Sequence, residues 1–157
     1  MKKGIKILYA AAALSCFLSF PALAAETRSE YKEESSSIRS ELKALEENMS
    51  PLRTENKAVA AKYKAIRLDK KNTGTLSISK ENWQQARELH GQIKEIRSNM
   101  SGESVKNLRL QAKTALKEKN YDTALQNLEK ALEVKQSKQE PMEQINEIWK
   151  QIDELLN

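Results

Sequence analysis

The chain has 157 residues, of which 27 are Lys or Arg and 22 are Asp or Glu, so its net charge at pH 7 is +5. Aromatic residues make up only 5% of the chain, too few large apolar groups for a thick compact core. One cysteine and one histidine exclude a disulfide scaffold and offer no catalytic or metal-ligand cluster, so we expect no enzyme, no cofactor and no metal. The single histidine, His90, is expected on the surface.

The first 24 residues have the order of a secretory signal peptide. Three lysines precede an apolar run that ends at Phe20, and Ala22 and Ala24 occupy the A-x-A positions before a cleavage site. We therefore predict cleavage after Ala24. The alternatives are an uncleaved membrane anchor, since the apolar run approaches the roughly 20 residues of a spanning helix, and lipidation at Cys16. Pro21 and the small residues around it favour cleavage.

Removal of residues 1–24 changes the charge and the chemistry of the chain. It takes away three lysines and no acidic residue, so the net charge falls to about +2. Cys16 leaves as well, and no thiolate remains. With so little excess charge we expect no nucleic-acid partner, and membrane contact only through the signal peptide during export. The predicted location is extracytoplasmic, either periplasmic or secreted.

A heptad repeat runs from Tyr31 to Ile66 in steps of four and three residues. The candidate protein-binding seam consists of Ile38, Leu42, Leu45, Leu52, Val59 and Ile66. Asn56 either fixes the register of this seam or lies on a frayed part of it. Pro51 either kinks the helix or stands in the first turn of a second helix that Ser50 caps.

A turn and another amphipathic helix follow the heptad repeat. The Asn-Thr-Gly sequence at 72–74 is the strongest turn signal, and we expect a loop over residues 68–79. Ser79 is the expected cap of a helix that begins near Lys80. One face of that helix carries Trp83, Ala86, Leu89, Ile93, Ile96 and Met100. This face predicts antiparallel packing on the first helix, so that residues 25–100 form a long coiled-coil-like helical hairpin.

The remainder, residues 101–157, is predicted as a second helical hairpin followed by a C-terminal capping helix. The break between the two arms falls at Lys119 and Asn120, and the last helix opens at Pro141. Packing between the arms is expected at Leu108, Ala112, Tyr121, Ala124, Leu128 and Ala131. The fold class predicted for the whole chain is therefore all-α.

The stretch from Leu116 to Glu133 resembles the second half of a tetratricopeptide repeat. The match consists of an Asn-Tyr-Asp turn, the small residues Ala124 and Ala131, and Leu128 in a large apolar position. One repeat of about 34 residues is covered. The resemblance implies peptide or protein binding, and the alternative is a plain antiparallel hairpin with small residues at its crossing.

A fainter resemblance, at residues 76–89, is to small periplasmic chaperones of the Spy and CpxP type. Ser79 opens an amphipathic helix there, but Asn82 stands where the Leu-Thr-x-x-Gln signature of that family has Gln. The resemblance implies an exported all-helical protein that dimerises into a cradle.

Together these patterns predict an exported, non-enzymatic helical protein that binds other proteins through its apolar seam, as an extracytoplasmic chaperone or adaptor. The expected partner is a client protein or a second copy of the chain, which would make a homodimer. The alternative function is a structural coiled-coil spacer of the cell envelope with no client.

Overall fold

The computed structural model describes residues 27–100 and 102–157, and the predicted signal peptide, residues 1–24, lies outside the described residues. Within the described residues the chain forms five α-helices and no strand. The helices are α1 (Arg28–Thr73), α2 (Lys80–Asn99), α3 (Val105–Lys117), α4 (Tyr121–Gln136) and α5 (Gln139–Leu156). The prediction of an all-α fold is confirmed.

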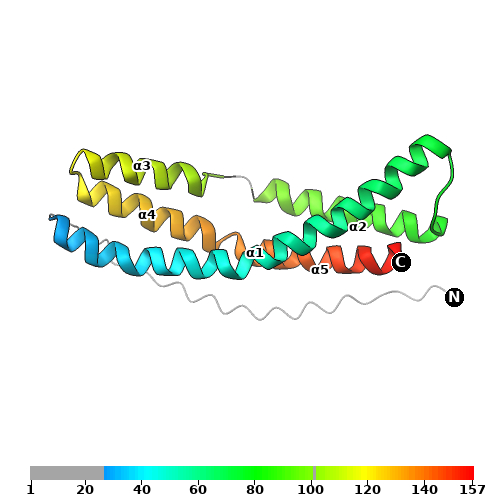
Figure 1. The fold of residues 1–157 in the computed structure, drawn as a ribbon, viewed down its shortest axis with the longest axis horizontal. Coiled ribbons are helices and arrows are strands. Elements are labelled where there is room, and N and C mark those ends of the chain that lie inside the picture. Colours follow the sequence, from blue (N-terminus) through cyan, green and yellow to red (C-terminus); the bar gives the residue numbers. More distant parts are fainter. Residues whose placement is uncertain (1–26, 101) are drawn as a thin grey trace.

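Helix α1 begins at a capping box and is unbroken for 46 residues. Thr27 accepts a hydrogen bond from the Glu30 amide, and the Glu30 carboxylate accepts one from the Thr27 amide. Pro51 lies inside the helix, and Figure 1 shows that α1 changes direction near its middle. The helix ends at Gly74, whose φ of 75° only glycine adopts readily.

The loop expected from residue 68 therefore begins later, because no residue before Gly74 interrupts the helix. Helix α2 begins at Lys80, as expected, and the Ser79 hydroxyl accepts a hydrogen bond from the Asn82 amide at 3.0 Å. Asn120 caps α4 in the same way, through the Thr123 amide at 3.1 Å. Side-chain capping thus marks the starts of three of the five helices, α1, α2 and α4.

Helices α4 and α5 follow α1, one after the other, from one end of the molecule to the other (Figure 1). Three of the polar contacts that join them are Glu46 with Lys135, Asn56 with Asn146, and Lys62 with Asp153. Along these contacts the residue numbers of α4 and α5 increase as those of α1 increase. Helix α1 therefore runs parallel to both helices. Helices α3 and α2 pack on the outer sides of α4 and α5 respectively.

The packing of α1 against α2 differs from the prediction. No Cα atom of α1 lies within 8 Å of one in α2, so the two helices do not form a coiled-coil-like hairpin. They meet through side chains: the ring of Tyr63 stacks on those of Trp83 and His90, with centroids 5.0 and 4.6 Å apart. The physical reason is that α5 presents a strongly apolar stripe and lies between them, against both helices.

Two hydrophobic cores lie along α1. The first joins its N-terminal half to α3 and α4, around Leu42, Leu125 and Leu132. The second joins its C-terminal half to α2 and α5, around Trp83 and Trp149. The boundary predicted at residue 100 therefore does not separate the cores, because α1 contributes to both and α5 belongs to the second. Among the described residues, 27–100 and 102–157, no helix is both long and apolar enough to cross a membrane.

Candidate binding site at the junction of the two cores

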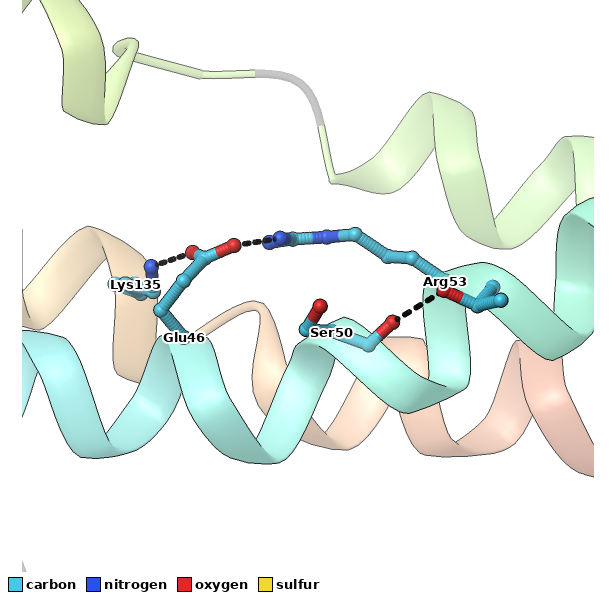
Figure 2. Close-up of polar contacts among 5 residues, drawn as sticks. Glu46, Ser50, Arg53 and Lys135 are labelled. Atoms are coloured by element: carbon cyan, nitrogen blue, oxygen red, sulfur yellow. Dashed lines mark hydrogen bonds and ion pairs between the residues drawn. The ribbon is translucent and has the colours of Figure 1, made fainter.

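A buried lysine marks the middle of the molecule, where the first core gives way to the second. Lys135, near the end of α4, is only 6% exposed, and its ammonium group pairs with the carboxylate of Glu46 on α1. The same carboxylate pairs with Arg53, so Glu46 lies between two cations, as Figure 2 shows. This clamp ties α4 to α1 about one turn before Pro51.

The two cations determine the charge state of Glu46. The hydrogen bond from Lys135 holds the pKa of Glu46 below its ordinary value, and Arg53 acts in the same direction. Partial burial of the carboxylate raises the pKa and is outweighed. Glu46 is therefore ionised at neutral pH, and its charge compensates the buried ammonium group.

A cavity of about 510 Å³ lies beside this clamp, between α1, the start of α3 and the end of α4. We call it the junction cavity. Its lining residues are Glu46, Met49, Arg53, Gly102, Ser104, Val105, Lys106, Arg109, Lys135 and Lys138. Five of these side chains are cationic and one is a carboxylate, which already serves Lys135 and Arg53. The cavity is therefore suited to an anionic group.

Helix α3 extends this positive charge along its outer side. At about 100° per residue, five exposed residues fall on one face, opposite the buried residues Leu108, Ala112 and Ala115. This α3 basic face consists of Lys106, Arg109, Leu110, Lys113 and Lys117. Helix α3 has no acidic residue, and within the described part of the chain none of the four cations forms an ion pair.

Leu110 is the apolar centre of the α3 basic face and is 62% exposed. Lys106 and Arg109 belong both to this face and to the lining of the junction cavity. The α3 basic face and the junction cavity therefore form one continuous surface. A partner with carboxylates and one apolar side chain would complement it.

The predicted seam packs against the two cores of the chain, whereas a protein-binding surface requires exposed side chains. Ile38 and Leu42 are 3% and 0% exposed in the first core, and Leu45 packs against them. Val59 and Ile66 pack on the second core, and Leu52, between the two cores, is partly buried. Two of the six seam residues are therefore interior and the other four are partly buried, because α4 and α5 supply complementary apolar surfaces within the same chain.

The residues predicted to pack the second hairpin lie inside it. Five are buried, namely Leu108, Ala112, Ala124, Leu128 and Ala131. Tyr121 is partly buried, and its ring centroid lies 6.1 Å from that of Tyr31 on α1. These positions therefore pack α3, α4 and α1 together, and only Tyr121 among them is partly exposed.

Sequence reasoning missed the clamp and the α3 basic face. The signal for Lys135 is its spacing. It follows Leu132 by three residues, and Leu132 follows Leu128 by four, so Lys135 continues the apolar stripe of α4. The signal for α3 is a run of thirteen residues with four cations and no carboxylate. Both are visible once the ends of the helices are known.

Comparison of the chain with family models, with curated proteins and with solved structures finds no match in any of the three. The resemblances to tetratricopeptide repeats and to Spy-type chaperones therefore stay predictions. Residues 27–100 and 102–157 contain no group of three or more His, Cys, Asp or Glu side chains that could hold a metal ion.

Proposed function

We propose that the protein is an exported, non-enzymatic adaptor that binds an acidic segment of a partner protein on the α3 basic face and in the junction cavity. The observation that carries this proposal is a set of four cations on α3 that form no ion pair with any described residue and surround an exposed leucine. Such charges steer an acidic partner toward the surface, and the leucine supplies a central apolar anchor. The signal-peptide pattern of the sequence supports export.

This proposal replaces the seam as the binding surface while keeping the class of function. Closure of the seam by α4 and α5 means that a client would have to displace a helix to reach Leu42. Among the described residues the exposed large apolar side chains are Leu68 and Leu110, which is little surface for a chaperone that holds unfolded chains. Recognition of a defined acidic segment fits this surface better.

The test uses the chain from Ala25 and two fluorescent peptides that alternate leucine with glutamate or with glutamine. Fluorescence anisotropy should show binding of the glutamate peptide alone, with an affinity that falls as salt is added. In the variant Arg109→Glu/Lys113→Glu we expect a loss of at least about tenfold, equivalent to about 1.4 kcal/mol. Lys57→Glu/Lys64→Glu, which reverses two exposed cations of α1, is the matched control and should bind normally.

Equal binding of both peptides, or equal affinity of the Arg109→Glu/Lys113→Glu variant and the unchanged chain, would contradict the adaptor function.

A second candidate function is the envelope spacer. It is favoured by one observation, the 46-residue helix α1, which spans about 70 Å and carries both cores. A spacer needs this length and not the charge of α3, so it predicts that neither peptide binds.

A further inference from the structure

A second cavity, of about 320 Å³, lies between the C-terminal half of α1 and α2. It exists because stacked rings, rather than closely packed backbones, join the two helices. The rings of Tyr63 and Trp83 line it and are themselves 6% and 4% exposed. The cavity thus has a rigid aromatic side and an open side.

Four cations surround this α1–α2 cavity: Arg67 and Lys70 of α1, and Arg87 and Lys94 of α2. No carboxylate is among its lining residues. Within the described part of the chain none of the four forms an ion pair, and the ammonium group of Lys70 lies over the face of the Trp83 ring, 5.9 Å from its centroid. Cations gathered without a counterion repel one another, and an anion bound among them removes that cost.

The electrostatic surroundings of His90, which also lines the cavity, are consistent with this charge. Burial lowers the pKa of His90, and Lys94, Arg97 and Arg67 lower it further. From α5 the group that faces the imidazole is the uncharged ring of Trp149, with its centroid at 5.7 Å. All the charged groups that act on His90 are therefore cations.

The shape and the donors of the cavity narrow the class of ligand. Two guanidinium and two ammonium groups, divided between two helices, match a compact anion with several charges and several acceptor oxygens. Gly91 leaves one part of the wall without a side chain, and a Cβ atom placed there would meet nothing within 4 Å. We infer that the α1–α2 cavity is a binding site for a phosphate-bearing ligand, separate from the surface that we propose for the partner protein.

The test is a titration of the chain from Ala25 with tripolyphosphate, followed by calorimetry and by the NMR signals of the imidazole. His90 is the single histidine of the chain, so its ring signals need no assignment. We expect saturable binding and a rise in the His90 pKa, since a bound anion stabilises the imidazolium. Arg67→Gln/Arg87→Gln should weaken binding at least tenfold, by the loss of two charge-assisted contacts, about 1.4 kcal/mol or more.

Two further variants make the result specific. Lys57→Gln/Lys64→Gln removes the same charge from exposed positions of α1 that line neither cavity, and should leave tripolyphosphate binding and the His90 shift unchanged. Gly91→Met fills the open part of the wall and should weaken binding without unfolding the helix. Unperturbed His90 signals, normal binding by Arg67→Gln/Arg87→Gln, or an equal loss in Lys57→Gln/Lys64→Gln would overturn the inference.

The source of the phosphate is decided by a second arm with vesicles. Co-sedimentation with phosphatidic acid vesicles, but not with phosphatidylcholine vesicles, and its loss in Arg67→Gln/Arg87→Gln would assign the site to a lipid headgroup. Binding of tripolyphosphate without co-sedimentation would assign it to a soluble phosphate. Absence of binding in both arms would contradict the site, and would leave the peptide experiment on α3 unaffected.

Discussion

Because Lys135 is buried and Glu46 is not, the two residues of the clamp at the junction of the two cores should contribute unequally to stability. Its partner Glu46 has a side chain that is 50% exposed, whereas the side chain of Lys135 is 8% exposed. Loss of the carboxylate would leave a buried ammonium group without compensation, whereas loss of the lysine leaves a half-exposed carboxylate that still pairs with Arg53.

We therefore predict that Glu46→Gln lowers the free energy of unfolding by about 1–3 kcal/mol and Lys135→Met by about 1 kcal/mol or less. The measurement is urea unfolding at pH 7. Because the pKa of Glu46 is lowered in the folded chain, its contribution is present above its ordinary value of 4.5 and disappears as the pH falls through the lowered value. The reverse order of the two variants would show that the clamp does not compensate a buried charge.

Glu129 on α4 has the opposite kind of environment. Its Oε1 atom is buried without a hydrogen-bond partner, as is Oε2 of Glu34 on the facing side of α1. Burial raises the pKa of Glu129, and the carboxylates of Glu133, Glu34 and Asp122 raise it further. Ionisation of this group therefore costs more in the folded chain than in the unfolded chain.

For this reason Glu129→Gln should stabilise the protein at pH 7, by up to about 1 kcal/mol. The raised pKa means that the unchanged chain recovers this stability as the pH falls through the raised value, so the gain should vanish at about pH 4. Thermal unfolding at both pH values measures it. Glu154→Gln, at an exposed site on α5, is the control; a gain of the same size there, or one that persists in acid, would refute the explanation.

At the scale of the helices, one buried amide pair sets α1 against α5. Asn56 is 5% exposed, and its side-chain oxygen accepts a hydrogen bond from Asn146 at 3.1 Å. The Asn146 amide also donates to Glu55 at 3.0 Å, and Asn56 donates to the sulfur of Met142. Of the two interpretations open from the sequence, a register-fixing residue and a frayed seam, the burial of Asn56 favours the first.

The prediction that follows concerns the pair. Asn56→Leu should cost about 1–3 kcal/mol, because Asn146 loses its buried partner, whereas Asn56→Leu/Asn146→Leu should recover most of that loss. A double-mutant cycle by chemical denaturation measures the coupling between the two amides. Strict additivity of the two substitutions would mean that this hydrogen bond does not contribute to the alignment of α1 and α5.

Much of the helical structure follows from local signals in the sequence, and the pairing of helices does not. Ser79, Asn120 and Gly74 mark helix ends through capping chemistry that involves residues only a few positions away. The heptad repeat indicates an apolar stripe on α1 but contains no information about which stripe covers it, since α2, α4 and α5 all present one. That choice depends on non-local packing, which is why the hairpin of α1 with α2 was predicted incorrectly and the clamp was missed.

For the whole molecule, closure of the seam within one chain separates the residues that maintain the fold from those proposed to bind. Leu42 of α1 is fully buried in the core that α1 forms with α3 and α4, whereas Leu110 is exposed on the α3 basic face. We predict that Leu42→Ala lowers the free energy of unfolding by about 2–5 kcal/mol. Leu110→Ala should change it by less than about 0.5 kcal/mol while weakening binding of the glutamate peptide. Equal destabilisation by both substitutions, measured by chemical denaturation, would contradict this separation.

The internal closure of the seam by α4 and α5 is tested most directly by the mass of the chain from Ala25 in solution. Multi-angle light scattering over a wide range of concentrations should give the mass of one chain throughout, and the unfolding midpoint should not depend on concentration. A dimer that loses helical structure as it dissociates on dilution would show that the seam of α1 is completed by a second copy, and would contradict the account.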